Sequence, residues 1–307
     1  FPEQIMAEAI LNQPHFQDAD KAREYLEATR WPHGVVCPHC GVIDGHYKLP
    51  EGKNTRPGVY KCASCSEKFS VTVGTVFEAS KIKLHLWLQA TYLMSASKKG
   101  ISAKQLERML GVTYKTAWFM AHRIRAAMDI APTKQLGEGG APVEIDETYW
   151  GNTSAKPKRR SSVDKMKIVS LVERGGEKRS VHVASVNYLT LRPIMQGLVA
   201  AKARVMTDEL AAYKPTSRDF ASHETVNHKS GEYSRGDVTT NSVESSFAIL
   251  KRGLYGTFHS VSEQHLQRYA TEFDFRWNNR AALGVNDVQR TNAALKGIEG
   301  KRLTYRA

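Results

Sequence analysis

All four cysteines of this 307-residue chain fall into two C-x-x-C pairs, Cys37/Cys40 and Cys62/Cys65, with 21 residues between the pairs. Each pair lets two thiolates converge on one tetrahedral ion, and four protein sulfurs leave no open position for water. Gly41, directly after the first pair, suits the tight turn of such a knuckle. The spacing therefore predicts a small zinc ribbon with a structural zinc ion, whose ligands would be Cys37, Cys40, Cys62 and Cys65.

Two disulfides are the alternative interpretation of these cysteines. Residues 1–9 lack the basic segment followed by an apolar one that a secretory signal needs, and disulfides are rare in proteins that are not secreted. This favours zinc. The ion should contribute most of the folding free energy of residues 34–76, on the order of 10 kcal/mol in comparable peptides.

The composition indicates a globular protein of two or three modules. Hydrophobic residues make up 41% of the chain and charged residues 24%, and no apolar run approaches the length needed to cross a bilayer. Lys and Arg exceed Asp and Glu by 13, and both halves of the chain share the excess. A polyanion such as a phosphate backbone fits this charge, although a merely soluble basic protein fits it equally well.

Changes in residue pattern divide the chain into four segments. Residues 1–33 form an N-terminal helical segment with a short helix over 14–31, and residues 34–80 hold the zinc ribbon. Residues 81–136 have a helical period with two breaks, which predicts three helices. A Gly-rich linker then opens the last segment, residues 137–307.

The last segment alternates between strand-like and helical patterns, which predicts an α/β core. Strands are expected at 143–149, 167–173, 180–186 and 203–207, and helices at 191–201, 240–252 and 262–277.

Residues 102–118 predict a helix-turn-helix, with Gly111 in the turn and Ser102 and Thr113 as helix caps. A core at three- and four-residue spacing would comprise Leu106, Met109, Leu110, Val112, Ala117, Met120 and Ile124. The exposed side of the second helix, where a major-groove reader keeps its contacts, would comprise Tyr114, Lys115, Trp118, His122, Arg123 and Arg125. An ordinary helical hairpin with solvated basic residues is the alternative.

A second basic feature lies at residues 156–160, where Lys158, Arg159 and Arg160 follow the first predicted strand of the core. These side chains predict a loop that grips DNA, and a solvated charge run is the alternative.

Three acidic residues carry the strongest chemical signal. Asp146 lies in a strand where it would share one face with Glu144 and Thr148 while Glu147 points away, Asp208 ends a second strand, and Glu244 lies early in a helix. Singly, each acid is more often a solvated charge than a ligand. Together, two strand-borne aspartates and a helix-borne glutamate can bind two Mg²⁺ ions about 4 Å apart, which activates a water or a 3′ hydroxyl and stabilises the leaving oxygen.

These motifs resemble those of the DDE transposases of bacterial insertion sequences, in the ISXO2-like group that carries a zinc ribbon ahead of its catalytic core. The resemblance covers nearly the whole chain. It rests on the knuckles and the helix-turn-helix, and on the runs Trp31-Pro32-His33-Gly34, Ile145-Asp146-Glu147-Thr148-Tyr149, Thr207-Asp208, Thr240-Asn241-Ser242-Val243-Glu244 and Leu250-Lys251-Arg252-Gly253.

The resemblance implies a multidomain α+β protein: a small zinc ribbon, a helical helix-turn-helix region and a ribonuclease H-like α/β catalytic core. It implies that Asp146, Asp208 and Glu244 hold two Mg²⁺ or Mn²⁺ ions, with Lys251 as the basic residue after the third acid. Some relatives use asparagine at the third position, and Asn241 stands one helical turn before Glu244, so either or both could face the metals.

The expected function is that of a transposase that binds transposon-end DNA, cleaves phosphodiester bonds and joins the 3′ ends to target DNA. Its partner would be double-stranded DNA, both terminal inverted repeats and target. Because two ends must meet, a homodimer or larger assembly is implied, working in the cytoplasm on the nucleoid and without a membrane. The alternatives are a non-catalytic DNA-binding regulator with the same N-terminal modules and a metal-dependent nuclease that cuts without joining. All three acids at workable spacing argue against the regulator.

Overall fold

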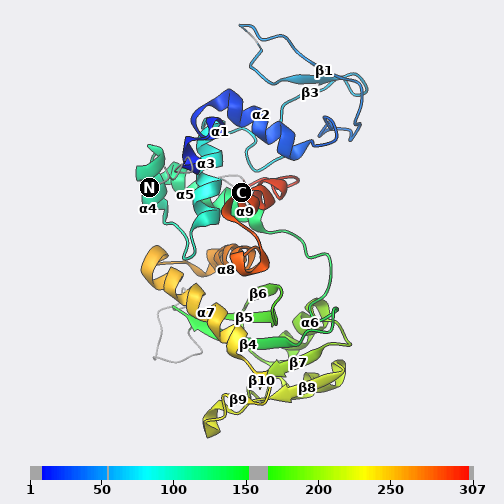
Figure 1. Cartoon of the computed structure of the whole chain (residues 1–307), viewed down its shortest axis with the longest axis vertical. Coiled ribbons are helices and arrows are strands. Elements are labelled where there is room, and N and C mark those ends of the chain that lie inside the picture. Colours follow the sequence, from blue (N-terminus) through cyan, green and yellow to red (C-terminus); the bar gives the residue numbers. More distant parts are fainter. Residues whose placement is uncertain (1–8, 54, 152–164, 304–307) are drawn as a thin grey trace, which may run out of the picture. The chain divides into compact units, whose positions relative to one another are not determined.

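The computed structural model describes residues 9–53, 55–151 and 165–303 and contains two units (Figure 1). We call Phe1–Ser97, Ile101–Met128 and Asp287–Ala307 the ribbon unit, and Lys98–Gly100 and Asp129–Asn286 the sheet unit. Residues 287–303 thus pack with the N-terminal part of the chain, whereas the sequence-based division grouped them with the core. Within the described ranges, no helix combines the length and the apolar character that crossing a membrane requires.

The ribbon unit begins with two short helices and a small sheet. The helix predicted over 14–31 is broken at Asp18 into α1 (Pro14–Gln17) and α2 (Ala19–Arg30), because the Asp18 carboxylate accepts the N–H groups of Asp20 and Lys21 and so caps α2. The strands β1 (His46–Lys48), β2 (Tyr60–Cys62) and β3 (Lys68–Phe69) form an antiparallel sheet in that order. Trp31 packs edge-on against Tyr60 and Phe69 at 5.8 and 6.0 Å between ring centroids.

The rest of the ribbon unit is helical: α3 (Leu84–Ala96), α4 (Ala103–Leu110), α5 (Tyr114–Met128) and α9 (Asp287–Lys296). The predicted caps are confirmed. Ser102 forms a capping box with Gln105, Gly111 ends α4 in the left-handed region (φ 65°), and Thr113 accepts the Thr116 N–H at 3.3 Å. The strand and helix patterns of the sequence did not reveal α9, which packs on α2, α3 and α5.

The sheet unit is built on five strands in the order β6-β5-β4-β7-β8. Their bounds are β4 Val143–Trp150, β5 Met166–Glu173, β6 Lys178–Val183, β7 Arg204–Thr207 and β8 Ser222–Thr225. The pairs β4/β5 and β5/β6 are antiparallel, whereas β4/β7 and β7/β8 are parallel. This mixed sheet is consistent with the ribonuclease H-like core that the sequence predicts.

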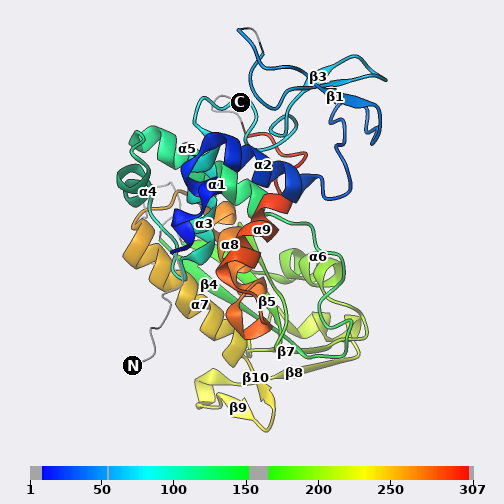
Figure 2. The same ribbon diagram turned by 45° about the horizontal axis from the view of Figure 1, so that its top comes forward.

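Helices cover both faces of this sheet (Figures 1 and 2). On one face, α6 (Tyr188–Leu198) packs on the inward side chains of β4 and β5. On the other face lie α7 (Asn241–Gly253) and α8 (Glu263–Asn278). Because successive strand residues point to opposite faces, β4 sends Val143 and Ile145 into the α6 side and Trp150 into the α7 side.

A short hairpin connects β8 to α7. The turn η4 (His228–Ser230) is followed by β9 (Ser234–Arg235) and β10 (Val238–Thr239), which pair with each other. These elements, together with β8, were not predicted from the sequence because they are too short to show a period. They bring residues 228–240 close to the end of β7, where the acidic residues gather.

Candidate active site

Asp146 and Asp208 meet where strand β7 ends. Asp208 directly follows β7, which runs parallel to β4 and pairs with it only at Val143 and Glu144. Asp146 lies two residues beyond Glu144 on β4 and points to the same face of the sheet. The carboxyl groups of Asp146 and Asp208 therefore lie at the same edge of the sheet. Their oxygens lie within 4.8 Å of each other, which is close enough to share a cation.

Glu147 is the third member of this acidic cluster. Its carboxylate also lies within 4.8 Å of those of Asp146 and Asp208, although its side chain leaves β4 on the face opposite to Asp146, as the alternation along the strand predicts. Its side chain starts on the α6 face, where its Oε2 accepts a hydrogen bond from the Tyr213 hydroxyl at 2.9 Å. Since β7 ends before this level of β4, both acids can reach Asp208 around the open edge.

The ionised state of the acidic cluster is unfavourable when no cation is bound. Burial and the neighbouring carboxylates of Glu147 and Asp208 raise the pKa of Asp146 to about 8. Burial also raises the pKa of Glu147 and of Asp208, and in Asp208 the Leu210 N–H, which donates to Oδ1 at 3.0 Å, opposes the rise. A bound divalent cation would supply the positive charge that the cluster lacks.

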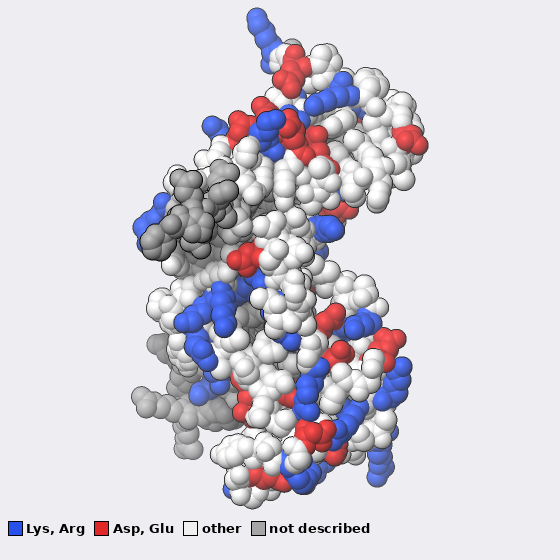
Figure 3. All heavy atoms as spheres, viewed as in Figure 1, with Lys and Arg blue, Asp and Glu red and all other residues white. Residues whose placement is uncertain are grey.

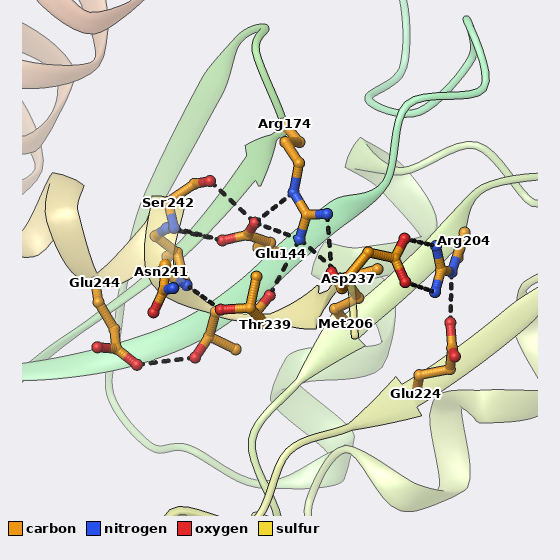
Figure 4. Close-up of polar contacts among 12 residues, drawn as sticks. Glu144, Arg174, Arg204, Met206, Glu224, Asp237, Thr239, Asn241, Ser242 and Glu244 are labelled. Atoms are coloured by element: carbon orange, nitrogen blue, oxygen red, sulfur yellow. Dashed lines mark hydrogen bonds and ion pairs between the residues drawn. The ribbon is translucent and has the colours of Figure 1, made fainter. Parts of the chain in front are cut away.

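Glu244 approaches this cluster from the first turn of α7. Its charge contributes to the raised pKa of Asp146, but its carboxylate is not among the three that lie within 4.8 Å of one another. Its Oε1 accepts a hydrogen bond from the Thr240 hydroxyl at 2.8 Å. Asn241, the first residue of α7, is exposed, and Figure 4 shows it beside Glu244 at the same end of the helix.

His228, the first residue of the turn η4, is a further neighbour of the site. Its Nε2 lies 3.6 Å from Glu244 Oε1 and 3.4 Å from the Thr240 hydroxyl, and its charge lowers the pKa of Asp208. Its ring contacts that of Tyr233 at 5.3 Å. His228 therefore lies against Glu244 and close enough to Asp208 for its charge to act on that carboxyl group.

Lys251 lies in the last turn of α7 and is half-buried. It follows Glu244 by seven positions, which corresponds to two helical turns and about 10 Å along the axis. The two residues therefore share a helix face, with Lys251 well beyond the acidic cluster.

The four cysteines form a second cluster, in the ribbon unit. Their sulfurs lie within 4.8 Å of one another, with Cys37 Sγ 3.7 Å from Cys65 Sγ and Cys40 Sγ 3.6 Å from Cys62 Sγ. Sulfurs at about 2.3 Å from a tetrahedral ion stand about 3.8 Å apart, whereas a disulfide requires about 2.0 Å. The N–H groups of Cys65 and Ser64 lower the pKa of the Cys62 thiol to about 6, whereas burial and the neighbouring cysteines raise the pKa of the Cys65 thiol to about 12.

The predicted DNA-reading face of α5 is only partly exposed. Tyr114 and Lys115 lie in its exposed first turn and Trp118 is half-buried, but His122 and Arg123 are buried. Arg123 donates to the Glu78 carbonyl oxygen at 2.7 Å and lies over the Trp87 ring. The assignment of His122, Arg123 and Arg125 to an exposed face is therefore wrong, because the second half of α5 is a core helix of the ribbon unit.

The prediction for Met109, in the same region, is also wrong. Met109, predicted as core, is 55% exposed, so the outer surface of the helix-turn-helix runs along α4 and the first turn of α5. On the face drawn in Figure 3, basic side chains lie over both units and are interspersed with acidic ones. Lys158, Arg159 and Arg160 lie outside the described residues.

Comparisons with known proteins match both clusters. Residues 136–278, which include the acidic cluster, match the family model of the ISXO2-like transposase domain, and residues 17–68, which include the cysteines, match that of the transposase zinc-ribbon domain. The chain is also 32% identical to an uncharacterized protein in transposable element ISH50 of Halobacterium salinarum, over 85% of this chain and 91% of that relative.

Proposed function

The chain belongs to the ISXO2-like transposase family, and from this we propose that it cuts transposon-end DNA with two divalent cations and joins the freed 3′ ends to target DNA. The observation that carries the proposal is the meeting of Asp146 and Asp208 within 4.8 Å, with the charge of Glu244 reaching Asp146. Acids that far apart in the sequence meet at one sheet edge only through folding.

The residues present fit a pair of Mg²⁺ or Mn²⁺ ions. Carboxylate oxygens are the ligands that these hard cations prefer, and the cluster of Asp146, Glu147 and Asp208 is short of positive charge. When bound, the ions would lower the pKa of a water or a 3′ hydroxyl and stabilise the leaving oxygen. We assign the ligands to Asp146, Asp208 and Glu244, with Asn241 at the same helix end as a further oxygen donor.

The chain's other residues would orient these ligands and the DNA. Tyr213 holds Glu147 and Thr240 holds Glu244 by hydrogen bonds of 2.9 and 2.8 Å. Lys251, two turns further along α7, would pair with a phosphate of the DNA strand. His228, which touches Glu244, would lie beside the scissile phosphate.

DNA binding would start in the ribbon unit. Tyr114 and Lys115 lie in the first turn of the second helix of the helix-turn-helix, the position from which such helices contact base edges. Trp118, half-buried one turn later, would flank this contact, and Lys158, Arg159 and Arg160 would add phosphate contacts. Because two ends must be joined at one target, we expect a dimer or larger assembly on chromosomal DNA at the nucleoid.

The test of the proposed function is the Asp146→Ala variant. It should bind end DNA as the wild type does and lose cleavage by at least the 10²- to 10³-fold that loss of one stabilising donor costs. Matched against it, Asp219→Ala changes an aspartate of the same unit that pairs with Arg192 and does not belong to the acidic cluster, and this variant should cut normally. Cleavage by Asp146→Ala at the wild-type rate would refute the assignment of the site.

Strand transfer needs its own measurement. Pre-cut ends with a free 3′ hydroxyl, offered with a plasmid and Mg²⁺, should be joined to the plasmid. A protein that cuts end DNA but never joins pre-cut ends is a nuclease, and the joining half of the proposal would then be wrong.

A further inference from the structure

Glu144 is a fully buried carboxylate in the middle of a sheet, two residues before Asp146 on the same strand. A buried charge is costly unless hydrogen bonds and an opposite charge compensate it, so its partners show what it is for. Its two oxygens accept the N–H of Ser242 at 2.6 Å, the Ser242 hydroxyl at 2.9 Å and the N–H of Val243 at 3.2 Å. These donors form the first turn of α7 (Figure 4).

The carboxylate of Glu144 therefore acts as the N-terminal cap of α7, supplied from another element. The residue at the usual capping position, Thr240, donates its hydroxyl to Glu244 and caps none of the described helix amides. Helix N-terminal N–H groups carry a partial positive charge that favours an anion. Without Glu144, the second and third amides of α7 would be left without acceptors next to a buried surface.

Arg174 supplies the opposite charge. Its Nε donates to Glu144 Oε1 at 2.9 Å, and its other nitrogens donate to the carbonyl oxygens of Asp237 at 2.9 Å and Thr239 at 3.5 Å. Asp237 is held a second time, because its carboxylate pairs with Arg204 (Figure 4). The guanidinium of Arg174 thus neutralises the Glu144 carboxylate and also holds the backbone that leads into α7.

We propose that Glu144 and Arg174 are positioning residues: their ion pair, in which Glu144 is fully buried and Arg174 half-buried, ties the first turn of α7 to β4 and thereby sets the position of Glu244 relative to Asp146. Two residues of β4 span about 6.6 Å, and Val243, whose N–H is held, directly precedes Glu244. The distance between the third acid and the first is therefore fixed through a short, charged connection. The functional half of this inference rests on the proposed metal site, whereas the cap itself does not.

The mechanical half of the inference can be tested on the full chain without metal. In Glu144→Gln the anionic acceptor is lost while the side-chain volume is kept, so the amides of residues 242 and 243 should lose at least tenfold in hydrogen-exchange protection. The matched control is Glu173→Gln, a buried carboxylate of the same sheet that accepts the Gly137 N–H at 2.7 Å. Unchanged protection at 242 and 243 in Glu144→Gln, or equal loss in both variants, would overturn the cap.

The functional half is tested by Mn²⁺ binding, followed by the spin resonance of free Mn²⁺. Loss of groups that orient metal ligands typically weakens metal binding 10- to 100-fold, so Glu144→Gln should bind Mn²⁺ about tenfold more weakly and Glu173→Gln within twofold of the wild type. Ser242→Ala removes only one of the bonds to Glu144 and should bind about twofold more weakly, which keeps the test valid if Glu144→Gln does not fold. Equal Mn²⁺ binding by Ser242→Ala, Glu144→Gln and the wild type would overturn the positioning role.

Failure of the proposed function gives a different result. If Asp146→Ala binds Mn²⁺ as tightly as the wild type, the metal site itself is wrong, and the positioning role falls with it. The exchange experiment then still decides whether Glu144 caps α7.

Discussion

The cysteine cluster and the acidic cluster both gather groups that bind metal, yet they are built in different ways. The four cysteines lie within 29 residues of sequence, on two knuckles that each supply two ligands. The acids of the second cluster come from β4 and from the residue after β7, 62 positions apart, and Glu244 comes from a helix further on. The first cluster is a local motif, whereas the second exists only when the sheet has formed.

We expect the two clusters to differ in role, with a structural role for the cysteines and a chemical role for the acids. Four sulfurs complete a tetrahedral site, so a bound ion there has no position left for a reactant. The carboxylates of the acidic cluster are half-buried at an open sheet edge, and burial together with the neighbouring carboxylates raises the pKa of Asp146 to about 8, so a cation bound there would relieve unfavourable charge. The ribbon should therefore respond to metal with folding, and the sheet unit should respond with activity.

Removal of zinc should have the largest effect. A strong chelator should unfold residues 34–76, because the ion contributes on the order of 10 kcal/mol to such modules, and end-DNA binding should weaken with it. Hydrogen exchange measured along the full chain checks this, since the strands of the sheet unit should keep their protection. Full end binding by zinc-free protein would contradict the structural role of the cysteines.

Within the acidic cluster, the two glutamates should differ in effect. Glu244→Gln should reduce cleavage by at least 10²-fold, since we assign it to the metals. Glu147→Gln should reduce cleavage about tenfold, the lower end of what loss of a group that orients a metal ligand costs, since its carboxylate is already held by Tyr213. Cleavage rates of the two variants at saturating Mg²⁺ test this. A larger loss in Glu147→Gln than in Glu244→Gln would show that the third metal ligand is Glu147 of β4 and not Glu244 of α7.

The sequence predicted the members of the cysteine cluster completely and those of the acidic cluster only in part. Cysteine spacing alone identified the ligands of the first, because a C-x-x-C pair fixes its own geometry. Asp146 and Asp208 were predicted to meet, but the membership of Glu147 depends on β7 ending before that level of β4, and no periodicity reveals where a partner strand ends. The signal for Glu144 was present: an acid between Val143 and Ile145 in an apolar strand needs a buried partner.

The same limit explains the error at the helix-turn-helix. The boundaries of α4 and α5 followed from caps and a glycine, which act locally. The burial of His122 and Arg123 depends on α3 and on the loop around Glu78, which pack against α5. A basic residue on a helix indicates an exposed face only where nothing else covers that face.

The pH dependence of stability should reveal the charge of the acidic cluster when no divalent cation is bound to it. The folded-state pKa of Asp146, about 8, lies above its unfolded value near 3.8, so the folded state binds the extra proton and stability is lost as pH rises from about 4 to 8. Asp146→Asn removes this loss. At pH 8, in buffer without Mg²⁺ or Mn²⁺ and with zinc retained, it should melt higher than the wild type, by about 2–4 °C for each kcal/mol recovered.

Asp219 serves as the control for that measurement, because its hydrogen bonds with Arg192 lower its pKa. The ionised carboxylate of Asp219 therefore stabilises the folded state as the pH rises, whereas that of Asp146 destabilises it. Asp219→Asn should not raise the melting temperature at pH 8. Equal melting of the wild type and Asp146→Asn at pH 8 would show that neither burial nor the neighbouring carboxylates disfavour the charged form of Asp146.

The smallest effect is expected at the DNA-reading helix. Lys115→Ala should weaken end binding only a few-fold and reduce the slope of log K against log salt by about 0.9 if it contacts one phosphate. Arg123→Ala should instead lower the melting temperature, because Arg123 is a buried partner of the Glu78 carbonyl. A Lys115→Ala variant with an unchanged salt slope would exclude Lys115 from the interface.

Crystals of the protein with transposon-end DNA and Mn²⁺, measured at the manganese absorption edge, would show where the cations bind. We predict two anomalous peaks at the sheet edge, one shared by Asp146 and Asp208 and one reached by α7 through Glu244 or Asn241, and none among the cysteines once zinc fills that site. Density for end DNA with no manganese between Asp146 and Asp208 would contradict the assignment of this edge as the catalytic centre.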